Sequence, residues 1–176
     1  MLKIAGVYGA IAGSIVISVM IAGLVMSGGE GPSSSAVFGY LVMIVALTLI
    51  FLGIKKHRDQ NLGGVIKFGP AFILGLMIAG IAGLFYVIGW EGYTTLAHYD
   101  FAGDYANAMV EKAKAAGAEG EALQKAIDDA EAFRKSYADP LYRLPMTFIE
   151  IFPVGLVVAL VSALVLRNPK AFPARG

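Results

Sequence analysis

The chain contains no cysteine and few charged residues, and each shortage excludes a class of protein. Without cysteine it can have no disulfide framework, no thiolate metal ligand and no thiol nucleophile. Charged residues make up 15% of its 176 residues, whereas a soluble domain carries about 25%. The net charge is only +1, and basic residues do not cluster with aromatic ones, so we expect no nucleic-acid partner. A mean hydropathy of +0.70 is typical of a membrane protein.

Motifs that would indicate an enzyme are also missing. The two histidines, His57 and His98, fall near opposite membrane surfaces in the topology argued below, and neither belongs to an H-E-x-x-H motif. No G-x-S-x-G motif is present to activate a serine. The glycines of NLGGVIKFG, residues 61–69, match neither common phosphate-binding pattern. We therefore expect no catalytic activity, no cofactor and no metal ion.

Four apolar runs dominate what the chain does contain. Each is about 20 residues long, which at 1.5 Å per residue matches a hydrocarbon core of about 30 Å. Runs of this length without strand alternation form helices in lipid. The first run is longer than the apolar core of a signal peptide, so we expect it to be a retained span. The prediction is an all-α integral membrane four-helix bundle, a single membrane domain over residues 1–176, with spans at about 4–26, 36–54, 70–90 and 146–166.

Residues 98–140, between the third and fourth runs, have a different composition. Alanine, glutamate and lysine dominate, and two amphipathic patterns are separated by Gly117 and Gly120. Asp139 and Pro140 then end the second pattern. We predict an extramembrane helical hairpin that leans on the ends of the membrane helices, since it is too small to be stable alone. We expect its acidic residues to form a solvated helix face and not a calcium site.

Basic residues indicate how the bundle is oriented, because they are enriched in short cytoplasmic loops. The segment 27–35 has none, whereas the second connection and the end of the chain are basic. We expect cytoplasmic N and C termini, an outer hairpin, and contact between the second connection and anionic lipid headgroups. The basic residues concerned are Lys55, Lys56, Arg58, Lys67, Arg167, Lys170 and Arg175.

Two further sets of residues indicate contacts of the spans. Aromatic residues near the outer ends suggest a belt at the lipid interface, namely Tyr40, Tyr86, Trp90 and Tyr93. Small residues recur every four positions in three spans and predict close helix packing; the alternative is that one stripe stays free for another copy or a partner. These stripes are Ala5, Gly9 and Gly13; Ala71, Gly75, Ala79 and Gly83; and Gly155, Ala159 and Ala163.

Three motifs together resemble a known family. They are GIKKHRDQNLGGVIKFGPAF (53–72), YVIGW (86–90) and TFIEIFPVG (147–155), and they are similar to the bacterial membrane proteins catalogued as domain of unknown function 4199. The resemblance covers nearly the whole chain. It implies a multi-pass protein of the bacterial inner membrane with a periplasmic insertion, and no particular activity. By this resemblance alone, the candidate functional residues are Lys55, Arg58, Asp59, Gly63, Gly64, Thr147, Glu150, Pro153 and Gly155.

Glu150 is the one carboxylate inside an apolar run, and it allows two interpretations. It lies about 6 Å inside the outer end of its run, next to Pro153, which withholds a helical hydrogen bond. We favour a structural role, with hydrogen bonds to Tyr86, Trp90 or Tyr93 and with Arg143 just above. The alternative is a titrating group in transport, since carboxylates within membranes often mark such paths.

The chain as a whole therefore has two candidate functions. The favoured one is a non-catalytic membrane module that acts through partner binding or self-association, as a homo-oligomer or with another membrane protein. The alternative is a small transporter or proton-coupled permease that uses Glu150. The spans contain few other polar residues, and the inverted repeats typical of transporters are not evident.

Overall fold

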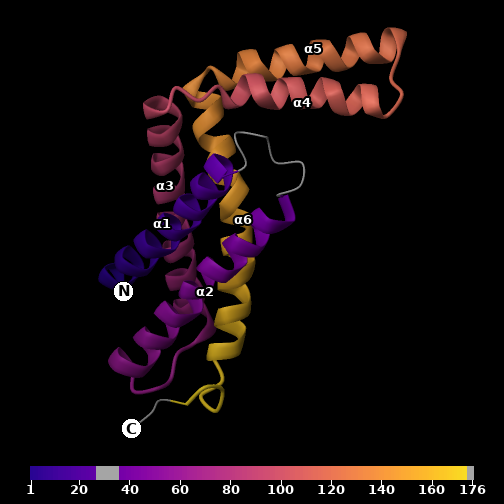
Figure 1. Ribbon diagram of the computed structural model, residues 1–176. Helices are drawn as coiled ribbons and strands as arrows, with labels where there is room; N and C mark the ends of the chain where they lie inside the picture. Colours follow the sequence, from indigo (N-terminus) through magenta and orange to yellow (C-terminus); the bar gives the residue numbers. More distant parts are fainter. Residues whose placement is uncertain (27–35, 174–176) are drawn as a thin grey trace.

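A computed structural model of the protein describes residues 1–26 and 36–173. These residues form six α-helices and no strand (Figure 1). Four of the helices are long and apolar enough to cross a membrane. This confirms the all-α class with four candidate spans. The helices are α1 (Leu2–Met26), α2 (Ala36–Asn61), α3 (Phe68–Leu96), α4 (Phe101–Ala115), α5 (Gly120–Tyr137) and α6 (Pro140–Leu166).

All four of these long helices exceed the apolar runs that predicted them, and three of them do so by more than one turn. The last turns of α2 contain residues 55–61, which we had placed in a loop, so the second connection is shorter than expected. An i,i+4 ion pair between Lys55 and Asp59 supports these turns. Helix α3 continues past Trp90 to Leu96, and α6 already begins at Pro140. The expected outer loop 27–35 and Arg175 lie outside the described residues.

Helix α3 forms the middle of the bundle. It packs against α1 on one side and α6 on the other, while α2 contacts all three. The small-residue stripes lie at these contacts, as predicted. A Cβ placed on Gly155 would lie 2.7 Å from the Ala79 Cβ, and one on Gly75 would lie 2.7 Å from the Ala159 Cβ. One on Gly13 would lie 2.3 Å from the Ala82 carbonyl oxygen, so these glycines allow the helices to pack closely.

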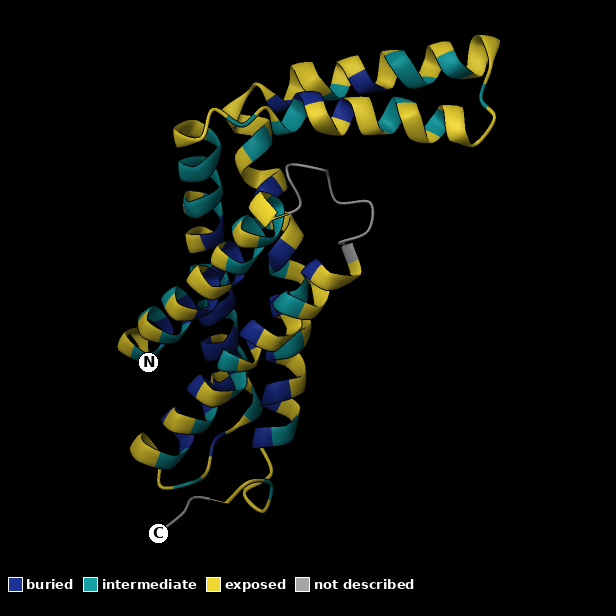
Figure 2. Cartoon of the chain, in the orientation of Figure 1, coloured by how far each residue is buried: buried dark blue, intermediate teal, exposed yellow. Residues whose placement is uncertain are grey.

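The predicted hairpin is formed by α4 and α5. Asp100 caps α4 by accepting a hydrogen bond from the Gly103 N–H at 2.9 Å, and Gly117 (φ +82°) and Gly120 (φ +54°) form the turn. The base of the hairpin leans on the ends of α3 and α6, as expected. Its long axis runs across these helices, and its tip projects past the bundle (Figure 1). Figure 2 shows the buried residues of the hairpin between α4 and α5, with exposed residues outside.

Candidate functional site

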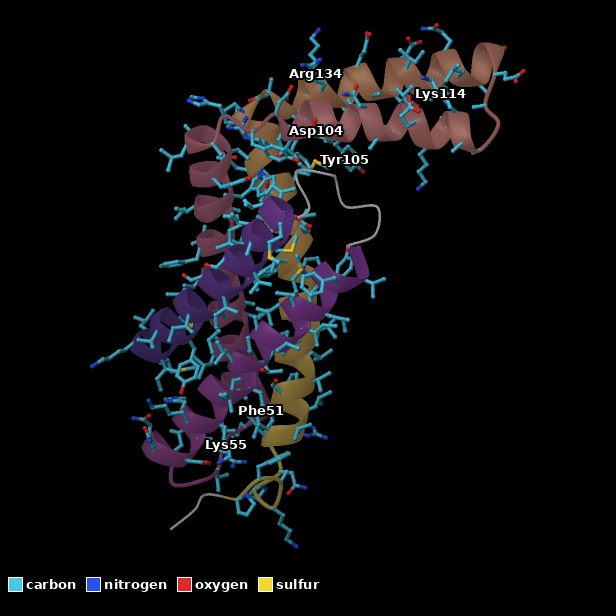
Figure 3. The ribbon with its side chains drawn as sticks, viewed as in Figure 1. Phe51, Lys55, Asp104, Tyr105, Lys114 and Arg134 are labelled. Atoms are coloured by element: carbon cyan, nitrogen blue, oxygen red, sulfur yellow. The ribbon has the colours of Figure 1, made fainter. Side chains whose placement is uncertain are left out.

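The candidate residues form two groups at different levels of the bundle. Thr147 and Glu150 lie in the half of α6 nearer the hairpin, whereas Arg58 reaches the last residue of α6, Leu166. Glu150 and Leu166 are about 24 Å apart along the helix at 1.5 Å per residue. The nine candidates therefore do not converge on one site. Figure 3 shows Lys55 near the end of α2 that is remote from the hairpin.

Arg58 is fully buried and binds the C-terminal segment of the chain. Its guanidinium donates to the carbonyl oxygens of Leu166 (3.4 Å) and Ala171 (2.9 Å) and to that of Phe172. Its Nε also donates to Asp59 Oδ1 at 2.7 Å. The guanidinium thus satisfies backbone acceptors at and beyond the end of α6. The expectation that Arg58 meets lipid headgroups was wrong, because protein carbonyls surround its charge.

The other candidates near Arg58 also hold the end of α2. Asp59 pairs with both Lys55 and Arg58. Gly63 (φ +61°) and Gly64 (φ +88°) adopt the left-handed region that favours glycine, and the Gly64 N–H donates to the Arg58 carbonyl at 3.0 Å. The chain can therefore reverse sharply toward α3. Lipid contact by the remaining lysines of this region stays a prediction.

Glu150 makes the contact that its sequence context suggested. The Tyr86 hydroxyl donates to Glu150 Oε2 at 3.0 Å and joins α3 to α6. Tyr86 is only 3% exposed, so its assignment to a lipid-facing belt was wrong, because the ring lies in the core between the spans. Trp90 and Arg143, two of the other suggested neighbours, form their hydrogen bonds with Tyr137 and Glu91 instead. The Glu150 side chain keeps an exposed side.

The remaining candidates of this group have ordinary roles in a helix. Thr147 is buried, and its hydroxyl donates to the Arg143 carbonyl at 3.0 Å. Gly155 provides the close contact with Ala79 described above. Helix α6 continues from Pro140 to Leu166 with Pro153 inside it, so the proline does not end the helix. These residues shape α6 and connect it to its neighbours. A further function for any of them stays a prediction.

Sequence reasoning missed the polar contacts that hold the hairpin base. Arg143 Nε and a terminal nitrogen each lie 2.7 Å from a different carboxylate oxygen of Glu91, and the guanidinium also donates to the Tyr137 carbonyl at 3.2 Å. This bidentate pair joins the end of α3 to the start of α6. The sequence did contain a signal for this pair: Glu91 comes directly after the third apolar run, and Arg143 comes shortly before the fourth.

Aromatic residues complete the hairpin base. Trp90 donates its indole N–H to the Tyr137 hydroxyl at 2.9 Å, and its ring meets Phe101 edge to face at 5.2 Å. Burial raises the pKa of Tyr137, although the Trp90 hydrogen bond opposes the shift. Burial, together with the neighbouring Asp104 carboxylate, raises the pKa of Tyr99 to about 12. Both tyrosines are therefore neutral at physiological pH and act as hydrogen-bonding and packing groups.

The charged and polar side chains of both candidate groups form hydrogen bonds or ion pairs with other parts of the described protein. Each buried side-chain nitrogen or oxygen there has a hydrogen-bond partner. The same residues contain no group of three or more histidine, aspartate or glutamate side chains placed to hold a metal ion. The arrangement connects helices to one another and to the C-terminal segment.

Comparison with known protein families identifies a family for this chain. A family model described as "Protein of unknown function (DUF4199)" matches residues 7–168. No curated protein and no solved structure matches the chain. The matched range contains the four candidate spans almost entirely, the hairpin and all nine candidate residues.

Proposed function

The chain belongs to the DUF4199 family of proteins of unknown function, and we propose that it is a non-catalytic membrane module that binds another membrane helix, in a second copy or in a partner protein. The observation that carries this proposal is the uncovered face of α1. Only 28% of the most apolar 18-residue stretch of α1 is buried, whereas 50% of the corresponding stretch of α3 is buried. Helix α1 therefore presents more of its surface to its surroundings than the central helix does.

The uncovered face of α1 has a chemistry suited to helix association. Its packed side carries Gly9 and Gly13, which touch α3. A shallow hollow lies on the other side, with two exposed serines inside it. In lipid, small residues permit close approach of two backbones, and serine hydroxyls can hydrogen-bond across the contact. The hollow is lined by Ala10, Ile11, Ser14, Ile15, Ser18 and Val19.

Crosslinking tests this proposal, because the cysteine-free chain allows single cysteines to be placed at will. Ser14→Cys should give a crosslinked species in native membranes, which mass spectrometry would identify as a homodimer or a complex. Val45→Cys is the matched control, since Val45 is an exposed residue in the α2 span. Recovery of monomer alone from Ser14→Cys, or equal crosslinking of both variants, would contradict the proposal.

A proton-coupled permease that uses Glu150 is the second candidate. It is favoured by the exposed side of this carboxylate within a candidate span. If Glu150 carries protons, Glu150→Gln should abolish a pH change in reconstituted vesicles that wild-type protein supports. The matched control is Tyr86→Phe, which removes the Tyr86–Glu150 hydrogen bond but keeps the carboxylate. An unchanged pH signal in Glu150→Gln would remove the transport hypothesis.

We further infer that the protein resides in a bacterial inner membrane, with both termini cytoplasmic and the hairpin periplasmic. The support is the position of basic residues at the ends of α2 and α6 that are remote from the hairpin. Lys55 and Lys56 lie in the last turns of α2, and Lys67 and Lys170 lie beyond the ends of α2 and α6. In intact cells, a membrane-impermeant thiol reagent should label Lys114→Cys in the hairpin and spare Lys170→Cys. The opposite labelling pattern would reverse the orientation.

A further inference from the structure

The base of the hairpin lies at the depth of Trp90. Phe101 is the first residue of α4 and Tyr137 the last of α5, and both contact the Trp90 side chain. Tryptophan at the end of an apolar span prefers the lipid–water interface, and the charged Glu91 follows it here. Helix α4 therefore begins, and helix α5 ends, at the level of the lipid headgroups.

From that level the hairpin extends sideways. Its axis runs across α3 and α6, and α4 is the hairpin helix nearer to the bundle (Figure 1). With 15 residues, α4 is about 22 Å long. Because the spans cross the bilayer, a helix that starts at the interface and runs across them must follow the membrane surface. The distal half of α4 then lies over lipid.

One side of α4 can be identified as the side that faces the bilayer. Phe101 marks it, because its ring contacts Trp90 in the bundle. Tyr105, Ala108 and Lys112 follow at i+4, i+7 and i+11 and share this side. Figure 3 shows Tyr105 below α4, toward the bundle. We call these four residues the membrane-facing stripe.

The charges of α4 differ between its sides. The membrane-facing stripe contains no acid, and its lysine makes no ion pair within the described residues. The acids Asp104 and Glu111 lie on the flank of the helix. Lys114, on the side away from the stripe, is paired with Glu111 at 2.9 Å. Lys112 is thus the α4 lysine left available to an external anion.

We propose that the α4–α5 hairpin rests on the bilayer surface, with the membrane-facing stripe of α4 in contact with lipid headgroups. Tyr105 occupies the interface as Trp90 does, Ala108 lets the helix approach closely, and the Lys112 ammonium binds lipid phosphate. Lipid is the occupant that fits best, because the stripe continues from Trp90 at the same depth and bilayer surrounds the bundle there. This inference does not depend on the function of α1.

Paired single cysteines test the orientation of α4. The two variants are Lys112→Cys and Lys114→Cys. Each replaces a lysine of α4, and the two positions lie two residues apart on different sides of the helix. Each is labelled with a fluorophore in nanodiscs of phosphatidylcholine and phosphatidylglycerol that contain a headgroup-linked nitroxide quencher. Quenching should be severalfold stronger at position 112 than at position 114. Equal, weak quenching at both positions would show a hairpin in water and overturn the proposal.

A second pair keeps Lys112 in place. A fluorophore on Ala108→Cys should be quenched severalfold more by the nitroxide lipid than one on Asn107→Cys, which lies on another side of α4. Adding Lys112→Glu should reduce quenching at position 108, with the larger loss in phosphatidylglycerol. If position 108 is shielded from both the lipid quencher and a water-soluble quencher, a protein surface covers the stripe, which would also overturn the proposal.

Discussion

At the scale of single residues, the charged and polar side chains of this protein make contacts between distant segments of the chain. Arg58 is a basic residue near a membrane surface, and its sequence context indicated lipid contact. Its side chain is instead enclosed by the carbonyls of Leu166, Ala171 and Phe172. Phe172 also packs edge to face on Phe51 at 5.2 Å between ring centroids. A buried charge is tolerated here because several acceptors surround it.

Loss of the Arg58 side chain should destabilise the fold. Arg58→Ala leaves buried carbonyl acceptors without donors, and we expect a loss of about 3 kcal/mol in the free energy of unfolding. Unfolding of the purified protein in detergent by denaturant titration would measure it. Lys56→Ala is the control: Lys56 lies over the Tyr8 ring at 5.8 Å, a contact that contributes about 1 kcal/mol at most where exposed. Equal effects of the two substitutions would contradict a special role for Arg58.

At the scale of helices, glycine has opposite consequences on the two sides of α1. On the packed side Gly13 lies against the α3 backbone, whereas a Cβ on Gly6 would meet no heavy atom within 4 Å. The same residue type therefore permits close packing at one position and leaves the surface open at the other. This difference separates the contact that forms the bundle from the face proposed to bind another helix.

Alanine substitutions should separate these two roles of glycine. Gly13→Ala places a methyl group 2.3 Å from the Ala82 carbonyl oxygen, so α1 must shift, and we expect destabilisation of about 1–3 kcal/mol. Gly6→Ala should be neutral or stabilise by about 0.5–1 kcal/mol through helix propensity. Thermal unfolding of both variants checks this. A Gly13→Ala protein as stable as wild type would show that α1 does not pack on α3 as described.

At the scale of the whole molecule, one polar cluster fixes the direction of the hairpin. The Glu91–Arg143 pair, the Trp90–Tyr137 hydrogen bond and the rings around them all lie where α3 ends and α6 begins. The hairpin touches the bundle at this base and projects from it (Figure 1). Its orientation over the membrane therefore depends on a small number of contacts at one end.

Breaking the ion pair should loosen the hairpin without unfolding the spans. Glu91→Gln removes the charge opposite Arg143, and we expect faster amide hydrogen exchange throughout α4 and α5 with little change in α3 and α6. Glu111→Gln is the matched control, because its ion pair with Lys114 is exposed and contributes about 0–1 kcal/mol. Unchanged exchange in the Glu91→Gln hairpin would mean that the aromatic contacts alone hold the base.

The sequence by itself determined the spans, the hairpin and the packing stripes. Runs of about 20 apolar residues must be helical in lipid, and glycine and alanine every four positions give a helix a side that another can approach. Near Glu150 it also indicated the Tyr86 contact, since both lie at similar depths in their spans. These features follow from local pattern and from the thickness of a bilayer.

Only the tertiary structure decided the partners of the charged residues and the direction of the hairpin. Arg58 and Phe172 are 114 positions apart, and Arg143 and Glu91 are 52 apart. Residues so far apart in the chain meet only after the helices have packed, and no local pattern specifies which of several acceptors a guanidinium will reach. The hairpin likewise runs across α3 and α6 because contacts at its base orient it, and those contacts join residues from α3, α5 and α6.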